Sequence, residues 1–244
     1  MLIRKPSNPW DKLKDLAEQF RNGDLRNPNL RFNIGFIRGS EVKQQFYCEQ
    51  RLHYQYLKGE VNLEMRESIA RRIVSMVLGV SRKPKVTGWL RIPLIGVIDD
   101  VPIISTPDAL LVEDSKVKLI VKVLTTTIDK AKPRIYGGDR ALAYIHMLLL
   151  DELGFNLNNT KYYIVKGPSN EVFKALIELR NSGRILSTYS NSLIYTLAYD
   201  EDYSRRIISW ALAYWKKLRS PKPNPSKHKC IRCSYKDFCP HAIR

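Results

Sequence analysis

The sequence predicts an α/β fold in which helices flank a mixed β-sheet. Its apolar patterns follow the order helices, strand meander, helix, strand and helices, and this order is typical of helices that cover a sheet. The chain has 244 residues, of which 44% are hydrophobic, enough for one sizeable core with a small appendage. Four cysteines, three of them near the C-terminus, favour a metal centre outside that core.

Three helices are predicted in the first third of the chain. Apolar residues recur with helical spacing over residues 10–20, directly after Pro9. Ser40 has the residue type of a helix N-cap, and a second helix is expected after it over residues 41–57. Residues 63–78 are predicted to form the third helix.

The strands are predicted mainly in the middle of the chain. Residues 85–101, 103–112 and 116–126 alternate or run apolar between turn-forming residues, which predicts a three-stranded meander. A fourth strand is expected over residues 161–166, and another within residues 185–199.

Three further helices and a linker complete the expected order. The helices span residues 138–153, where Gly154 follows as the terminator, 170–182 and 203–218. The Pro-rich stretch 220–225 predicts a stiff, extended linker that leads to the last three cysteines.

The chain therefore divides into four predicted regions. They are an N-terminal extension (1–30), a helical region with the first cysteine (31–84), an α/β core (85–219) and a C-terminal cysteine-bearing segment (220–244). No apolar run reaches membrane-spanning length, and the N-terminus lacks a signal-peptide pattern. We expect a cytoplasmic protein without a membrane partner, in a compartment where thiols stay reduced.

The C-terminal cysteines are spaced closely enough to bind one metal centre. Cys-x2-Cys is followed by five residues, a third cysteine and Pro240, and a zinc ribbon would add a second Cys-x2-Cys that is absent. The pattern favours a [4Fe–4S] cluster, with a zinc site using His228 or His241, two disulfides or free thiols as alternatives. The predicted ligands are Cys48, Cys230, Cys233 and Cys239.

The charge balance predicts a polyanionic partner. Lysine and arginine number 41 against 24 aspartate and glutamate, which gives a net charge of +17. Such an excess attracts polyanions, and nucleic acid is the usual one. A basic surface without a nucleic-acid partner is the alternative.

The order of elements and the cysteine spacing resemble the RecB-like nucleases. Tyr47-Cys48 on a helix, a meander bearing an Asp, and a Pro-rich lead into Cys-x2-Cys-x5-Cys are similar to the iron–sulfur branch that includes the CRISPR-associated exonuclease Cas-four. The resemblance covers residues 35–240. It implies a PD-(D/E)XK nuclease-like core, an iron–sulfur region joining the N- and C-terminal segments, and DNA, single-stranded or at duplex ends, as the partner.

The family's catalytic motif is altered in this chain. The family places an Asp on one strand and a Glu-x-Lys on the next, and the carboxylates hold a divalent ion that activates water. Asp108 matches the Asp, but Lys122 stands in the place of the Glu and Leu124 in the place of the Lys. A lysine at that position repels a metal ion, so magnesium or manganese is expected only if nuclease activity is retained.

The other replacements are also cations. Arg140 opens an Arg-x-x-x-Tyr144 where the family has Gln-x-x-x-Tyr, and Arg72 lies near the place of a family His. We expect Asp108 and Lys122 to form an ion pair that Arg140 approaches. Together the changes predict a metal-free cleft that binds DNA phosphates through Arg72, Lys122, Arg140 and Tyr144. Drift of these positions without a binding role is the alternative.

The resemblance therefore implies a Cas-four-like iron–sulfur DNA-binding protein whose nuclease site is inactivated. Its expected context is CRISPR spacer acquisition or DNA repair, with other proteins of those pathways as partners. Two alternatives remain. One is an active metal-dependent DNA exonuclease that uses other acids, and the other is a non-catalytic assembly subunit.

Overall fold

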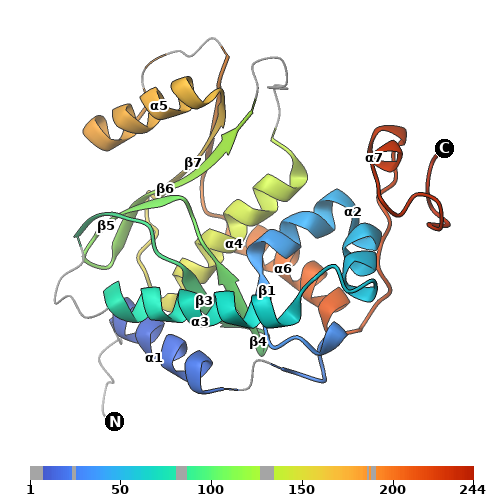
Figure 1. Cartoon of the computed structure of the whole chain (residues 1–244). Coiled ribbons are helices and arrows are strands. Elements are labelled where there is room, and N and C mark those ends of the chain that lie inside the picture. The colour runs from blue at the N-terminus through green and yellow to red at the C-terminus, as the bar shows by residue number, and fades with distance from the viewer. Residues whose placement is uncertain (1–7, 24–25, 81–86, 127–134, 186, 188–190) are drawn as a thin grey trace.

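The computed structural model describes residues 8–23, 26–80, 87–126, 135–185, 187 and 191–244. The strands are β1 (Ile37–Arg38), β2 (Thr87–Leu90), β3 (Leu94–Ile98), β4 (Val101–Ser105), β5 (Ala109–Glu113), β6 (Lys116–Thr125), β7 (Lys161–Gly167) and β8 (Leu193–Leu197). The α-helices are α1 (Pro9–Asn22), α2 (Gly39–Leu57), α3 (Leu63–Val80), α4 (Gly137–Leu153), α5 (Ser169–Ser182), α6 (Glu201–Trp215) and α7 (Lys227–Ile231). The helices and strands are arranged around α4 (Figure 1).

The strands form two sheets, with orders β1-β4-β3 and β2-β5-β6-β7-β8. In the larger sheet β6 runs parallel to β7, while β2–β5, β5–β6 and β7–β8 are antiparallel. The smaller sheet is mixed as well, because β1 is parallel to β4 and β3 is antiparallel to it. The predicted α/β class with mixed sheets and flanking helices is therefore confirmed.

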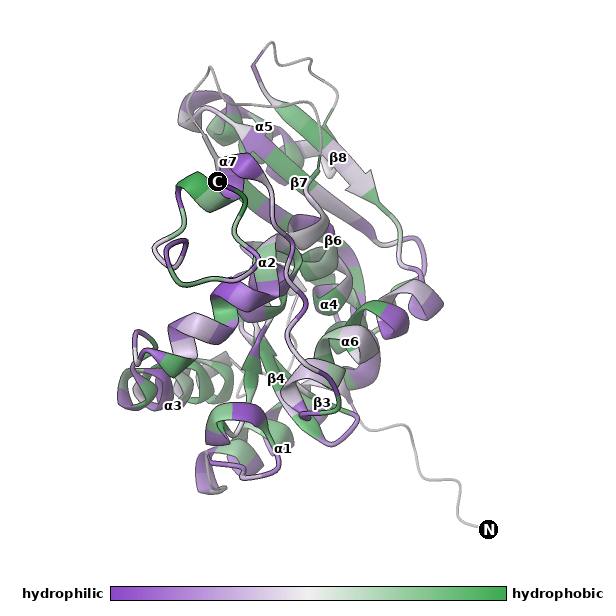
Figure 2. Cartoon of the chain, turned by 90° about the vertical axis from the view of Figure 1, so that its right-hand side faces the viewer, coloured by the Kyte–Doolittle hydropathy of each residue, from purple (hydrophilic) through white to green (hydrophobic). Residues whose placement is uncertain are grey.

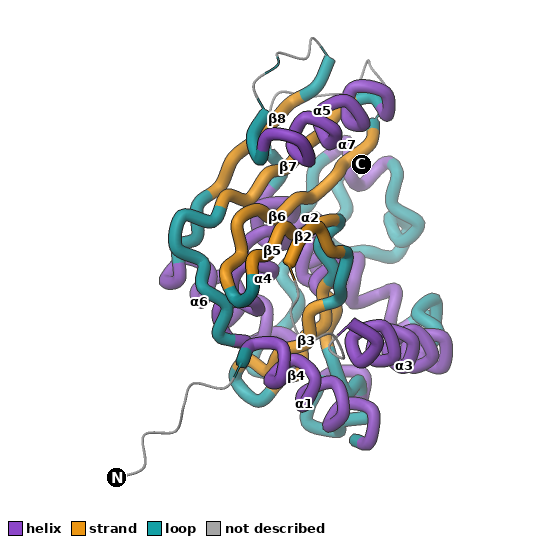
Figure 3. The backbone as a smooth tube through the Cα atoms, turned by 90° about the vertical axis from the view of Figure 1, so that its left-hand side faces the viewer, coloured by secondary structure: helices purple, strands orange, loops and turns teal. Residues whose placement is uncertain are grey.

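The larger sheet separates two apolar layers, since side chains alternate between the faces of a strand. On one face Ile120 and Ile164 belong to the main core, which includes the buried side of α4. On the other face Val121 and Val165 pack with α5. Figure 3 shows α5 on one side of the strands and α4 on the other. Because it is covered on several sides, α4 is apolar around most of its circumference, and Leu148, Leu149 and Leu150 are fully buried.

The first helix belongs to the same core. Trp10 and Leu13 are buried in the main cluster, where α1 contacts α3 and β3. The Trp10 indole N–H donates to the Asp114 carbonyl oxygen at 3.0 Å, which ties α1 to the turn between β5 and β6. The segment that the sequence indicated as an extension thus packs against the rest of the chain. Figure 2 shows β4 and α4, both rich in hydrophobic residues, enclosed by the surrounding helices.

The predicted three-stranded meander is wrong. The first predicted strand is two strands in different sheets, β2 and β3, separated by a stretch that includes Pro93. The second is divided into β4 and β5 near Pro107. Proline has no backbone N–H to donate to the hydrogen-bond ladder of a sheet. Each of these two prolines therefore lies where the chain leaves one sheet and enters the other.

Smaller differences concern helix ends and short elements. The second helix begins at Gly39 with Arg38 as its N-cap, so Ser40 lies in the first turn and is not the cap. The other predicted helices agree with the structure within a few residues, and Gly154 ends α4 in the left-handed conformation as expected. Neither the two-residue β1 nor the short α7 was predicted from the sequence. Within the described residues no helix has the length and apolarity needed to cross a membrane.

Candidate metal centre and basic groove

All four cysteines line one small cavity. Its volume is about 30 Å³, and it lies between α2 and the C-terminal segment, which runs beside that helix in Figure 1. The four side chains are Cys48, Cys230, Cys233 and Cys239. No disulfide joins any two of them, so the disulfide alternative is not what the fold adopts. Residues separated by more than 180 positions in the sequence are thus neighbours.

The helix is broken where it carries the first cysteine. Cys48 has φ −168° and ψ 108°, which are extended values inside α2. An extended residue interrupts the helical hydrogen-bond ladder and leaves nearby carbonyl groups in need of donors. Asn224 Nδ2 donates to the Phe46 carbonyl at 3.1 Å, and Lys229 Nζ donates to the Tyr47 carbonyl at 2.9 Å. The C-terminal segment therefore binds the helix at its break.

A buried carboxylate fixes the start of the same segment. Glu49 is fully buried, and its carboxylate accepts from Arg219 Nη2 at 2.9 Å and from the Lys222 backbone N–H at 2.6 Å. Gln45 Nε2 donates to it at 2.6 Å. Because a buried charge is tolerated only when it is paired and hydrogen-bonded, these contacts hold the Pro-rich linker firmly against α2.

Aromatic contacts fix the far end of the cysteine segment. Tyr54 of α2 lies 5.6 Å from the Tyr235 ring and 5.2 Å from the Phe238 ring. Tyr235 is buried and Phe238 is half exposed. Both belong to the loop between the last two cysteines, so the loop is held by α2 on one side.

The donor set of the cavity fits a soft metal centre. Four thiols in one cavity suit zinc or an iron–sulfur cluster, because thiolates prefer such metals. His241 also lines this cavity, whereas His228 faces the groove described below. In the described part of the chain no three His, Cys, Asp or Glu side chains are arranged tightly enough to hold a single ion. The four thiols therefore suit a metal in kind and line one cavity, but their side chains would have to move closer together to ligate it.

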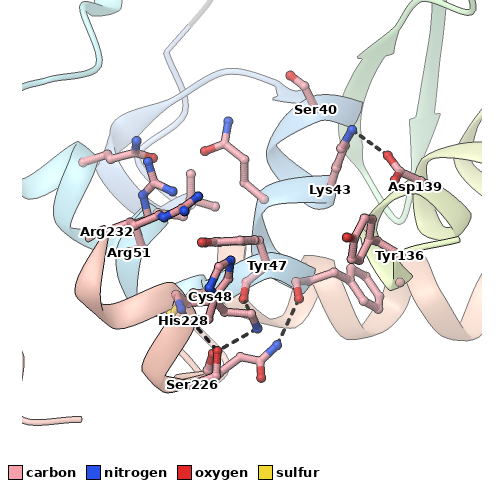
Figure 4. A pocket seen from close by; sticks show the side chains of 18 residues that line it. Ser40, Lys43, Tyr47, Cys48, Arg51, Tyr136, Asp139, Ser226, His228 and Arg232 are labelled. Atoms are coloured by element: carbon pink, nitrogen blue, oxygen red, sulfur yellow. Dashed lines mark hydrogen bonds and ion pairs between the residues drawn. The ribbon is translucent and has the colours of Figure 1, made fainter. Parts of the chain in front are cut away.

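A large groove opens beside the cysteine cavity. Its volume is about 1330 Å³, and its walls come from α2, the first turn of α4 and the C-terminal segment (Figure 4). The basic side chains lining it are Lys43, Arg51, His228, Lys229 and Arg232. Its acidic side chain is Asp139, which pairs with Lys43 at 2.6 Å. The groove therefore carries an excess of cations, and Cys48 lies in its wall.

One wall of the groove depends on a close helix contact. A side-chain carbon added to Gly138 would lie 2.7 Å from the Lys43 carbonyl oxygen, closer than such atoms approach. The glycine at the start of α4 therefore lets that helix approach the backbone of α2.

Two exposed aromatic side chains, Tyr47 and Tyr136, also line the groove. The Lys229 ammonium lies 5.2 Å from the centre of the Tyr47 ring.

The ion pair expected between two neighbouring strands is confirmed. Lys122 Nζ lies 2.8 Å from Asp108 Oδ2. The register of β5 and β6 pairs Ala109 with Val121, which places Asp108 opposite Lys122. The Val123 backbone N–H donates to the same carboxylate oxygen at 2.7 Å. Both charges are thus neutralised within the sheet.

A buried pair that sequence analysis missed lies next to this lysine. His146 is fully buried in α4, and its Nδ1 lies 2.7 Å from the Tyr162 hydroxyl. Burial, together with the nearby Lys122 charge, lowers the pKa of His146 to about 3. The sequence around His146 does not show that this histidine is buried beside a tyrosine hydroxyl and near a lysine.

The groove is not where the sequence predicted DNA contacts. Four residues carried that expectation, namely Arg72, Lys122, Arg140 and Tyr144, and none of them lines the groove. Arg140 and Arg72 are exposed on their helices, and among the described contacts Arg140 does not reach Asp108. Tyr144 instead packs edge-on against Tyr203, with ring centres 4.7 Å apart. The basic residues on both sides of Cys48 are the feature of the sequence from which the groove could have been predicted.

The sequence matches no protein family and no curated protein. Among solved structures, the crystal structure of SSO0001 is 15% identical, with 96% of each chain covered and a TM-score of 0.44. A similarity of that size carries no argument about function.

Proposed function

We propose that this chain is a nucleic-acid-binding protein whose binding groove is completed by a cysteine-ligated [4Fe–4S] cluster. The observation that carries the proposal is the shared wall. Cys48 lines both the cysteine cavity and the cationic groove. A cluster held by the four thiolates would fix the C-terminal segment, and that segment supplies His228, Lys229 and Arg232 to the groove.

The groove has the properties of a site for a nucleic-acid strand. Its cations exceed its acidic charge, which favours a phosphate backbone. Tyr47 and Tyr136 are exposed in it and offer ring faces on which bases can stack. Because phosphate contacts and stacking do not read base edges, we expect binding with little sequence preference.

We further propose that the chain descends from PD-(D/E)XK nucleases and has lost their metal-dependent cleavage. The contact between Lys122 and Asp108 supports this part, because the lysine and the Val123 N–H both engage the carboxylate oxygen that would otherwise face a cation. Placing a divalent ion there requires displacing the lysine. The context that the resemblance implies, CRISPR spacer acquisition or DNA repair, is part of the same proposal.

The test is binding and cleavage measured side by side. Labelled single-stranded and duplex DNA are titrated with anaerobically purified protein in chelator, over a series of salt concentrations. We expect affinity that falls steeply with salt and is unchanged by magnesium or manganese, without cleavage products. Cleavage that Asp108→Ala abolishes would establish an active nuclease instead, and weak binding that does not depend on salt would favour an assembly role.

A further inference from the structure

The arginines around α2 fall into two groups. In the first group each guanidinium meets a buried carboxylate: Arg38 and Arg66 pair with Glu41, and Arg219 pairs with Glu49. These arginines stabilise the fold, because each compensates a charge that burial would otherwise penalise.

Arg51 and Arg232 form the second group. Both line the groove, and neither has a carboxylate within ion-pair distance among the described residues. The Arg51 Nε–H is buried and has no hydrogen-bond acceptor in the described part of the chain. Its guanidinium carbon lies 5.5 Å from the centre of the Tyr47 ring, which restricts the side chain to one side of that ring. Because this Nε–H is closed to solvent, a ligand in the groove would be bound through the terminal amino groups of the Arg51 guanidinium.

The position of the two arginines in the groove is also specific. Arg51 follows the break at Cys48 in α2, and Arg232 lies between Cys230 and Cys233. Figure 4 shows both on the side of the groove opposite the Lys43–Asp139 ion pair. On that side no acidic side chain lines the groove within the described residues.

We infer that Arg51 and Arg232 form a phosphate-binding subsite, which holds one phosphate group of a bound nucleic-acid strand against the broken turn of α2. A guanidinium offers several N–H donors in one plane and binds two oxygens of a phosphate together, which an ammonium cannot do. The inference rests on the proposed function and deepens it, because it assigns one phosphate to two named side chains. The two lysines of the groove have protein partners: Lys43 pairs with Asp139, and Lys229 donates to two backbone carbonyls.

The experiment measures binding of a labelled oligothymidylate about 15 nucleotides long to the metal-loaded full chain by fluorescence anisotropy. Variants are Arg232→Ala and Arg51→Lys, and Lys227→Ala is the control. Lys227 is exposed on α7 and does not line the groove. Lys227→Ala therefore removes the same charge as Arg232→Ala at a nearby position outside the groove. Melting temperature and visible absorbance establish that each variant is folded and loaded.

We expect about a tenfold loss of affinity for Arg232→Ala, the usual effect of removing one charged hydrogen-bonding partner. The slope of log affinity against log salt should fall by about 0.7, the value for one phosphate contact on a single strand. Arg51→Lys should also weaken binding, although its charge is kept. Lys227→Ala should leave the slope unchanged.

Two results would overturn the inference, and they are distinguishable. If the unaltered protein binds the oligonucleotide but Arg232→Ala and Arg51→Lys behave like Lys227→Ala, the subsite is absent while the proposed function stands. If the unaltered protein does not bind the oligonucleotide at low salt, the proposed function fails and the subsite fails with it.

Discussion

Two charged regions of this molecule treat their cations in opposite ways. On the sheet, Lys122 is held by Asp108 and both side chains are largely buried. In the groove, Arg51 and Arg232 remain without carboxylate partners among the described residues. A net charge of +17 does not by itself say where an anion binds. Whether each cation is paired is therefore a better guide to the proposed binding surface than the number of cations.

The largest effect that tests this contrast should come from the cysteine site. Cys48→Ser removes one proposed ligand from the wall that the cavity and the groove share. We expect loss of bound metal and at least about a tenfold weaker oligonucleotide affinity, because metal binding and local folding are coupled. Metal analysis and anisotropy on the same preparation measure both. Ser234→Ala is the control, since Ser234 is exposed in the same loop and does not line the cavity. Normal affinity in metal-free Cys48→Ser would show that the groove forms without the metal.

An intermediate effect is expected at the start of the linker. Glu49→Gln removes the buried charge that Arg219 pairs with, and this should lower the free energy of unfolding by about 3 kcal/mol. Urea denaturation measures the loss. In the control, Glu152→Gln breaks the exposed pair with Arg205 and should cost less than about 1 kcal/mol. Equal losses in the two variants would mean that Glu49 does not anchor the segment.

The smallest effect on binding should come from Lys122, although the sequence alone assigned it to phosphate. Lys122→Met leaves the groove walls unchanged, so the oligonucleotide affinity should change by less than about twofold. A loss of affinity as large as that of Arg232→Ala would mean that the oligonucleotide binds at the sheet, near Lys122, and not in the groove.

The same substitution should change the titration of His146. Burial first, and then the Lys122 charge, lower the pKa of His146 to about 3, so removing the charge should raise it. The folded protein keeps this imidazole neutral while the unfolded chain protonates it near pH 6.5. Stability is therefore lost as pH falls from about 6.5 toward 3, and the loss should be smaller in Lys122→Met. Urea denaturation at several pH values, with NMR titration of the imidazole, checks both.

Local patterns predicted most of the helices but not the division of the strands between two sheets. The periodicity of residues 63–78 and the glycine at 154 depend on near neighbours, and both agree with α3 and α4. Whether β4 pairs with β3 and β1, or with β5, depends on contacts between distant segments. A two-residue strand such as β1 exists only because β4 lies beside it.

The candidate site shows the same division. The spacing of three cysteines and the opposed Asp108 and Lys122 were accessible from sequence, because spacing and strand alternation fix them. The groove was not, since its walls come from α2, α4 and the C-terminal segment. Arg51 and Arg66 look alike in the sequence. Only the folded chain gives Arg66 a buried Glu41 and leaves Arg51 facing the groove.

The approach of Gly138 to the Lys43 carbonyl has a mechanical consequence. It brings the start of α4 against the backbone of α2, so the separation of these two walls of the groove is fixed by backbone contact. The opposite wall is attached to α2 by side-chain contacts just before the C-terminal cysteines, such as those of Asn224 and Lys229. The two sides of the groove therefore differ in kind: one is set by backbone contact between two helices, and the other by side-chain hydrogen bonds that single substitutions can remove one at a time.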